Sequence, residues 1–279
     1  MNIALIGYGK MGRILERTAL ERGHRVAAAV DPFVSGAPAV SGAPLYATIA
    51  EWTQLSGAGN RVDVAVEFTR PDTAVENIRA LIEKGIPTVA GTTGWYDHLE
   101  EIEALVEGRK GSFCWSSNYS LGVNLFYRIA AFAAKLSDPF PEYDVGGWEF
   151  HHNKKIDSPS GTAKILAEKI LAAMTRKKKA VWEKLDRPPA PDELHFPSLR
   201  LGSMPGVHAV CFDSPADTIE ITHTGRSRDG LALGAIRAAE WLVNCAGPGK
   251  PAGSARSGVF TIDDVMEDIL KEGTQRKEK

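Results

Sequence analysis

The chain has 279 residues, of which 43% are hydrophobic and 24% are charged, and this composition is typical of one large or two ordinary globular domains rather than a disordered chain. The formal net charge of −2 gives no overall attraction to nucleic acid or membrane surfaces, and no apolar segment approaches the ~20 residues of a transmembrane helix. The three cysteines lack metal or redox spacing and the N-terminal segment lacks a signal-peptide pattern, so we expect a cytoplasmic protein without nucleic-acid or membrane partners.

The first part of the chain alternates short apolar runs with segments of helical spacing. The apolar runs typical of buried strands are residues 2–7, 25–31, 62–69, 87–94 and 111–118. Helical spacing covers residues 10–23 and 71–85, and a looser segment rich in Pro, Gly and Ser covers residues 32–44. Because parallel neighbouring strands need crossover connections, this order predicts a doubly wound parallel sheet of the Rossmann type.

The turn after the first strand carries glycines in G-x-G-x-x-G order. The first glycine permits a tight turn, the second lets the backbone approach a pyrophosphate, and the third lets helix and strand pack closely. An acid at the end of the next strand can bind ribose hydroxyls. We therefore expect a dinucleotide cofactor at Gly7, Tyr8, Gly9, Lys10, Met11, Gly12 and Asp31.

Asp31 is followed by Pro32 and Phe33, without an adjacent arginine to pair with a 2′-phosphate. This favours NADH slightly over NADPH, although a basic side chain from elsewhere in the fold could reverse the preference.

The middle of the chain predicts a second α/β unit with a more antiparallel, mixed sheet. A long apolar helix is expected over residues 120–137, and strands over 142–152, 198–212 (in two pieces around Pro205 and Gly206) and 217–225. Residues 229–244 predict a further helix, 247–258 a flexible connection and 259–270 one short final element. We expect a dinucleotide-binding domain at 1–118, completed by 229–279, and a substrate-binding and oligomerisation domain at 119–228.

Two histidines end the strand that closes at residue 152. Because side chains alternate along a strand, His151 and His152 should diverge, and since no third ligand has suitable spacing we expect no metal site. A histidine together with Lys155 suits proton donation or the neutralisation of negative charge. Ser160, Gly161 and Thr162 open a helix whose free N–H groups suit a carboxylate or phosphate. The same residues taken alone could equally be surface polar groups and a helix cap. Two minor features are the basic run 176–179, interpreted as solvated surface, and Asp157, which could orient a neighbour or shape the turn before Pro159.

Residues 149–163, EFHHNKKIDSPSGTA, resemble the signature E-x-H-H-x-x-K-x-D-A-P-S-G-T-A of the 4-hydroxy-tetrahydrodipicolinate reductase (dihydrodipicolinate reductase) family. Residues 66–78 (VEFTRPDTAVENI), 116–124 (SSNYSLGVN), 206–212 (GVHAVCF) and 220–242 are similar to further segments of that family. The glycine turn is one residue tighter than the family's common form.

The resemblance implies NAD(P)H-dependent reduction of a cyclic dicarboxylate imine in lysine and diaminopimelate biosynthesis, by a cytoplasmic homotetramer. It implies that His151 is a proton donor or acceptor, that Lys155 is a second proton donor, and that His152, Ser160, Gly161 and Thr162 bind substrate. It also places residues at the nicotinamide end of the cofactor: Gly91, Thr92, Thr93, Ser117, Asn118 and Tyr119.

Other hypotheses remain at this point. A semialdehyde dehydrogenase would need an activated cysteine, whereas Cys114 falls inside a predicted buried strand. A homoserine dehydrogenase would lack the His-His-x-x-Lys run before Ser-Gly-Thr. A regulator that senses NADH would bind the cofactor without turnover.

Overall fold

The computed structural model describes residues 1–33, 39–55, 61–247 and 250–275. The chain forms two compact units, one from Met1–Ser120 with Arg228–Lys279 and the other from Leu121–Ser227. The chain therefore leaves the first unit once and returns to it. Within the described residues, no helix has the length and apolar character needed to cross a membrane.

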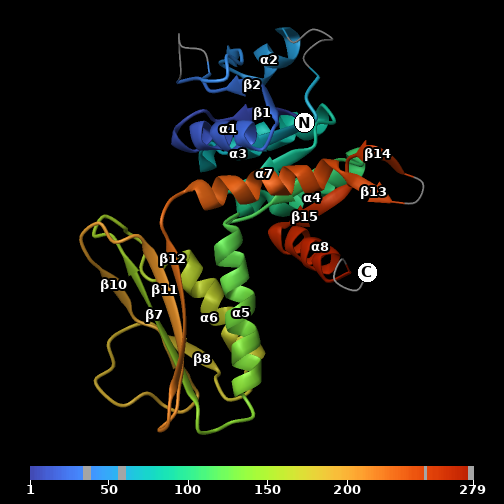
Figure 1. Cartoon of the computed structure of the whole chain (residues 1–279). Coiled ribbons are helices and arrows are strands. Elements are labelled where there is room, and N and C mark those ends of the chain that lie inside the picture. Colours follow the sequence, from blue (N-terminus) through green and yellow to red (C-terminus); the bar gives the residue numbers. More distant parts are fainter. Residues whose placement is uncertain (34–38, 56–60, 248–249, 276–279) are drawn as a thin grey trace. The chain divides into compact units, whose positions relative to one another are not determined.

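A seven-stranded sheet, parallel throughout, forms the centre of the first unit, in the order β15-β6-β5-β4-β1-β2-β3 (Figure 1). Its strands are β1 (Asn2–Ile6), β2 (Arg25–Val30), β3 (Leu45–Tyr46), β4 (Val64–Glu67), β5 (Thr88–Ala90), β6 (Ser112–Trp115) and β15 (Gly258–Thr261). β1, β2 and β4 are buried almost throughout, as expected for strands covered on both faces. The predicted doubly wound fold is confirmed.

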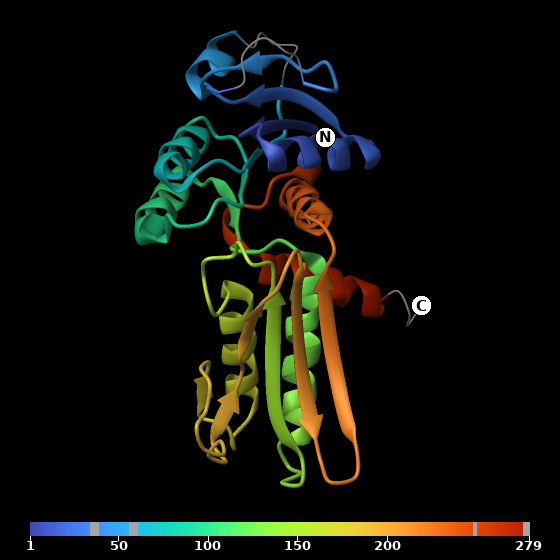
Figure 2. The same ribbon diagram turned by 90° about the vertical axis from the view of Figure 1, so that its left-hand side faces the viewer.

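Helices cover both faces of this sheet (Figure 2). They are α1 (Lys10–Glu21), α2 (Ile49–Leu55), α3 (Pro71–Glu83), α4 (Leu99–Arg109, preceded by the 3-10 turn Tyr96–His98), α7 (Asp229–Val243) and α8 (Ile262–Gln275). α1 and α7 pack against each other, whereas α2 and α3 pack on the face to which Ala4 and Ile6 point. α3 begins with Pro71 in its first turn, where the missing N–H costs no intrahelical bond.

The last segment of the chain differs from the prediction. Residues 259–270 belong not to one element but to β15, which pairs in parallel with β6, and to the helix α8. The predicted flexible connection 247–258 contains β14 (Lys250–Ser254), which pairs antiparallel with β13 (Cys245–Gly247) at its start; residues 248 and 249 lie outside the described part. Short strands rich in Gly, Ala and Pro carry no apolar alternation, so the pattern could not reveal them.

The second unit contains a four-stranded mixed sheet in the order β10-β7-β11-β12. Its strands are β7 (Asp144–His151), β10 (Ser198–Arg200), β11 (Gly206–Asp213) and β12 (Thr218–Gly225), and only β10 and β7 run parallel. The helices α5 (Leu121–Ser137) and α6 (Gly161–Ala173) cover one face, and the buried side chains of Val145, Val210 and Phe212 pack against them.

A small parallel pair, β8 (Lys179–Val181) and β9 (Glu193–His195), lies in the segment that no sequence pattern explained. Contacts around this pair explain why the basic run 176–179 is present. Lys177 is only 2% exposed, and its Nζ contacts the Glu193 carbonyl at 2.8 Å and Asp144 Oδ1 at 2.6 Å. Lys179 pairs with Glu193 and Arg176 with Asp138. The interpretation of this run as solvated surface is wrong for Lys177, which is buried, and for Arg176, which is half-buried, whereas Lys178 and Lys179 are exposed.

Candidate active site

The inner face of the second unit's sheet is apolar along most of its length and becomes polar where β7 ends. Strand register places Ser198, Glu149, His208 and His223 in one row across β10, β7, β11 and β12. Directly paired residues of neighbouring strands project from the same face, so these four side chains form a polar row beside the helices.

Glu149 is the centre of this row. Its side chain is completely buried, and Oε1 accepts from Ser160 N at 3.0 Å, Ser198 Oγ at 2.7 Å and Arg200 Nη2 at 3.1 Å. Burial alone would favour the protonated form, but hydrogen bonds from His208, Ser160 and Ser198 outweigh it and hold the pKa of Glu149 well below its usual range. Glu149 is therefore a buried carboxylate anion fixed from several sides.

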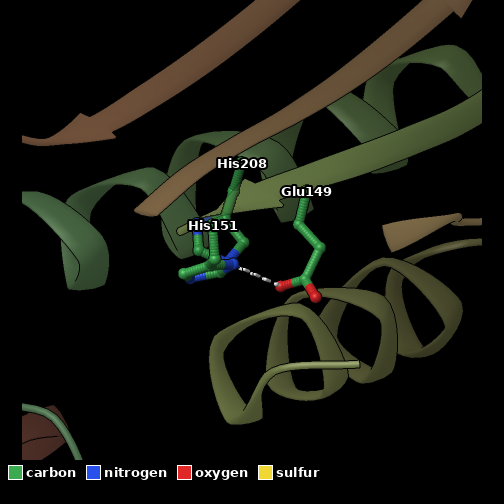
Figure 3. Close-up of side chains that lie close together, drawn as sticks. All are labelled: Glu149, His151 and His208. Carbon is green, nitrogen blue, oxygen red and sulfur yellow. Dashed lines mark ion pairs between the residues drawn. The ribbon is translucent and has the colours of Figure 1, made fainter. Parts of the chain in front are cut away.

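His151 follows two residues later on the same face. It is 9% exposed, whereas His152 is exposed, which confirms that the two side chains diverge. Nδ1 of His151 lies 3.4 Å from Glu149 Oε2, and its ring meets that of His208 edge-on, with the ring centres 5.1 Å apart (Figure 3). Desolvation is the main cause that lowers the pKa of His151 to about 4. His151 is therefore uncharged at neutral pH.

The loop after β7 brings a cation to this end of the sheet. Nζ of Lys155 lies 2.7 Å from Asp157 Oδ1, so Asp157 orients its neighbour as expected. Arg200 donates to the Asp157 carbonyl and to Glu149, which ties the loop to β10 and β7. The loop is thus held at both ends, with the Lys155 side chain about one-fifth exposed at 22%.

Helix α6 begins where the loop ends. Ser160 is its N-cap: the hydroxyl accepts from Ala163 N at 3.1 Å, donates to Glu149 and lies 3.1 Å from His208 Nε2. The Ser160 side chain is thus engaged inside the protein, whereas Gly161 is exposed and Thr162 half-buried. The first turn of α6 can present N–H groups to an anion through these two residues.

Glu149, His151 and His208 also have the residue types of a metal cluster, with one donor atom of each within 4.8 Å of the others. The guanidinium of Arg200 already neutralises the carboxylate, and Lys155 adds a second positive charge nearby. A metal cation would be repelled by both positive charges, so we interpret the cluster as a polar network without a metal ion.

A separate cavity of about 500 Å³ lies in the first unit, at the carboxyl ends of β1, β2 and β4, where the strand order reverses. Gly7, Gly9 and Asp31 line it. Gly7 has φ +91°, and a Cβ there would lie 2.1 Å from the Phe68 carbonyl oxygen, so only glycine fits. A Cβ on Gly9 would meet no atom within 4 Å, which leaves room for a pyrophosphate beside the N-terminus of α1.

Asp31 is oriented at this cavity by two main-chain bonds, from Tyr8 N at 2.8 Å and from Phe33 N at 2.9 Å. The Tyr8 side chain instead points into the unit, where it bonds Glu16. Lys10 is exposed, Met11 half-buried and Gly12 buried, with a Cβ on Gly12 only 2.3 Å from the Gly7 carbonyl. The residues present therefore fit a dinucleotide.

The remaining predicted cofactor residues follow β5 and β6, whose carboxyl ends are neighbours. Gly91 is required by packing, since a Cβ would lie 2.1 Å from the Phe68 ring. Thr92 is buried and donates to Glu67 at 3.0 Å, whereas Thr93 is exposed.

Ser117 is exposed and Asn118 half-buried, but the Tyr119 side chain is buried and its hydroxyl donates to the Cys114 carbonyl at 3.0 Å. Cys114 itself is fully buried, and burial raises its thiol pKa to about 12. This argues against a cysteine nucleophile.

Sequence reasoning did not select Glu149, Arg200 and His208 as site residues. Glu149 and His208 stood within the quoted motifs EFHH and GVHAVCF, but only the strand register shows that they meet. Arg200 carried no signal of its own.

Comparison with known proteins identifies the family of the chain. Residues 1–119 match the family model "Dihydrodipicolinate reductase, N-terminus" and residues 122–266 match "Dihydrodipicolinate reductase, C-terminus". A 4-hydroxy-tetrahydrodipicolinate reductase of Christiangramia forsetii is 35% identical over 97% of this chain and 100% of its own. The chain belongs to the 4-hydroxy-tetrahydrodipicolinate reductase family.

Members from Chromobacterium violaceum and Archaeoglobus fulgidus are each 34% identical, over 95% and 96% of this chain and 98% and 100% of their own. The fold of the dipicolinate-bound dihydrodipicolinate reductase from Paenisporosarcina sp. TG-14 is similar, with a TM-score of 0.73 at 22% identity over 94% of this chain and 97% of that one. The protein is thus an NAD(P)H-dependent oxidoreductase that reduces 4-hydroxy-tetrahydrodipicolinate in lysine and diaminopimelate biosynthesis. No observation favours a regulator without turnover.

Proposed function

We propose that the second unit binds the dicarboxylate substrate and that Lys155 protonates its ring nitrogen. The observation that carries this proposal is the convergence of Lys155, His151 and the N-terminus of α6 at one end of the sheet. A diacid needs cations and helix-end N–H groups, which Lys155, His152, Gly161 and Thr162 supply. Ser160 contributes by capping the helix that presents those groups.

Conversion of 4-hydroxy-tetrahydrodipicolinate to tetrahydrodipicolinate releases the 4-hydroxyl group with a neighbouring hydrogen as water, which leaves a ring C=C bond conjugated to the C=N bond. The ring then gains one hydride, on a carbon of that conjugated system, and one proton, which the nitrogen receives as the electron pair reaches it. When bound, the dihydronicotinamide supplies the hydride. The nitrogen becomes basic as the carbon is reduced, so a charged ammonium within reach gives up its proton there. Lys155 is the cationic candidate, and Asp157 holds its Nζ at 2.7 Å.

The test compares Lys155→Ala with Lys154→Ala, its exposed neighbour, as control. Lys155→Ala should lower kcat by a factor of about 100 or more while the Kd for NADH stays unchanged. Wild-type kcat in Lys155→Ala, measured by absorbance at the nicotinamide band, would remove Lys155 from the chemistry.

We propose that the first unit binds either NADH or NADPH through Gly7–Gly12 and Asp31, with NADH preferred. The oriented Asp31 carboxylate suits ribose hydroxyls and repels a 2′-phosphate. Arg70 lines the same cavity, with its guanidinium 5.3 Å from the Phe33 ring centre and 2.9 Å from Asp72. This basic side chain offers NADPH a partner and supports dual use. Gly91–Thr93 and Ser117–Tyr119 would then face the nicotinamide, chiefly through Thr93, Ser117, Asn118 and the main chain.

Asp31→Asn should weaken NADH more than NADPH, by about 1 kcal/mol, when both are titrated by fluorescence. Equal weakening would remove Asp31 from the ribose. Running NADH and NADPH side by side on the wild-type enzyme ranks the two cofactors directly.

We also propose a homotetramer in the cytoplasm, assembled through the second unit. Helix α5 exposes Leu125, Ile129, Phe132 and Leu136 by 41%, 52%, 63% and 57%. Their spacing of four, three and four residues places them on one face, and such an apolar stripe is typical of an interface. Phe132→Lys should lower the mass measured by light scattering, whereas Lys135→Ala should not.

A further inference from the structure

The buried row of the second unit contains two groups to which the proposed function gives no role, Glu149 and His208. We infer that Glu149 and His208 are positioning residues, which fix the His151 ring with its proton on Nδ1 and leave Nε2 free to accept a hydrogen bond from the substrate. This inference rests on the proposed function, because it concerns how His151 acts at the same site.

The two carboxylate oxygens of Glu149 have different surroundings. Oε1 is fixed by the frame of the fold, through Ser160 N, Ser198 Oγ and Arg200 Nη2. Oε2 faces the imidazoles, 3.4 Å from His151 Nδ1 and 3.3 Å from His208 Nε2 (Figure 3). The frame therefore sets the place of the oxygen that both rings meet.

An ionised carboxylate only accepts hydrogen bonds, so a ring nitrogen that faces it is favoured in its N–H form. His151 Nδ1 is buried and has no hydrogen-bond partner among the described residues, so the electrostatic attraction of the Glu149 carboxylate 3.4 Å away is what favours the Nδ1–H tautomer and leaves Nε2 with a lone pair. His208 Nε2 lies 3.1 Å from Ser160 Oγ as well, which keeps the proton of His208 on that nitrogen. The two histidines are thus held in defined tautomers by one anion.

Burial is the main cause that keeps His151 uncharged in the resting protein. Glu149 favours the imidazolium, whereas burial, His208, Lys155 and Arg200 oppose it. A neutral ring with Nε2 bare is an acceptor. Lys155 then remains the donor, and the two candidate proton carriers have separate roles.

Packing fixes the ring as well as its tautomer. His208 meets the His151 ring edge-on, and Gly206 leaves space for it, since a Cβ there would lie 3.0 Å from His151 Nε2. Small displacements of an aligned group cost large factors in rate. Loss of either support should therefore reduce kcat more than it affects substrate binding.

Steady-state kinetics of Glu149→Gln, His208→Gln and His208→Leu test the inference. We expect kcat to fall about 100-fold in Glu149→Gln and His208→Leu, with the Kd for NADH unchanged. His208→Gln keeps an N–H donor and should retain at least about 10 times more activity than His208→Leu. The matched control is Glu193→Gln, an equally buried carboxylate of the same unit that Arg187 bonds, and it should keep its kcat.

A double-mutant cycle separates positioning from general damage. In the His151→Ala background, Glu149→Gln should add almost nothing, because it acts through the missing ring. An undiminished further loss there overturns the inference. Wild-type kcat in His151→Ala would instead overturn the proposed role of His151 itself.

Nitrogen-15 NMR of histidine-labelled protein gives a readout independent of turnover. At pH 7 we expect the His151 signals of an Nδ1–H tautomer in the wild type and in Glu193→Gln, and a tautomer mixture in Glu149→Gln, which lacks the carboxylate that His151 Nδ1 faces. An Nε2–H tautomer in the wild type refutes the inference. The inference is also refuted if dialysis against a chelator abolishes activity and only added zinc restores it, because the cluster would then be a metal centre.

Discussion

Glu67 and Glu149 are both completely buried glutamates near strand ends, yet their surroundings move the pKa in opposite directions. At Glu149, burial is outweighed by several hydrogen bonds, and the pKa falls. At Glu67, burial dominates and raises the pKa to about 7, despite bonds from Thr69 and Thr92. Oε2 of Glu67 has no hydrogen-bond partner among the described residues. The pKa falls at Glu149, where both carboxylate oxygens accept hydrogen bonds, and rises at Glu67, where one oxygen accepts none from the part of the chain that the structure describes.

Glu67→Gln should change the pH dependence of stability. A carboxyl group whose folded pKa is raised stabilises fully below its unfolded pKa of 4.5, and this contribution is lost as pH rises towards 7. The glutamine side chain does not titrate, so the variant does not lose this contribution. The free energy of unfolding of Glu67→Gln minus that of wild type should therefore increase by up to about 3 kcal/mol between pH 4.5 and pH 8. Urea denaturation at the two pH values measures it, and a constant difference would contradict the raised pKa.

Gly206→Ala tests a close approach rather than a backbone conformation. The added methyl group would lie 3.0 Å from His151 Nε2 and force the ring to shift by a few tenths of an ångström. We expect kcat to fall about 10-fold with a loss of stability below about 1 kcal/mol. Gly146→Ala, where the nearest atom would lie 3.5 Å away, is the control. Unchanged kcat in Gly206→Ala would show that the His151 ring has room to move.

At the scale of elements, the sequence predicted those that carry their own pattern. The strands β1, β2 and β4 are apolar runs, and α5 and α7 are long helices, so periodicity revealed them. β15, β3 and the pair β8 and β9 are two to four residues long, and their existence depends on the neighbour with which they pair. Local pattern contains no information on such pairing.

The site residues fall into the same two groups, those that a local sequence pattern reveals and those that depend on strand pairing. His151, Lys155 and Ser160 are close in the sequence and could be selected from one motif. The row through Ser198, Glu149, His208 and His223 arises only when β10, β7, β11 and β12 adopt their register. Residues that meet through register cannot be grouped from one sequence unless a family resemblance singles them out.

Ser160→Ala tests how the start of α6 is held. The variant removes the N-cap acceptor for Ala163 N and a donor to Glu149. We expect a loss of about 1–2 kcal/mol in the free energy of unfolding by urea. Ser137→Ala is the control, because that hydroxyl donates only to the Ala134 carbonyl at the end of α5, and it should cost less than about 0.5 kcal/mol. Equal losses would show that Ser160 is not a special cap.

At the scale of the whole molecule, the two units should respond to acid in opposite ways. Glu149 stabilises the second unit above its unfolded pKa of 4.5, and this contribution is lost as pH falls. His151, whose folded pKa is about 4, stabilises fully above 6.5 and loses this contribution as pH falls towards 4. In the first unit, the contribution of Glu67 to the free energy of unfolding increases as pH falls from about 7 towards 4.5.

Hydrogen exchange at a series of pH values should therefore show amides of β7 and β11 losing protection at a higher pH than those of β1 and β4. β1 and β4 are buried almost throughout, whereas β7 and β11 contain several half-buried residues, so the test is the pH at which protection changes and not its level. Simultaneous loss of protection in both units would contradict the opposite responses.

The return of the chain to its first unit has a consequence for synthesis on the ribosome. Residues 121–227 form a continuous unit and can fold as soon as they emerge. β6 can pair with its outer neighbour β15 only after the end of the polypeptide has been made, and until then the backbone groups along that edge of β6 are unpaired. The nascent protein therefore carries a finished second unit and an unfinished first unit, and this interval is when a chaperone would protect it most.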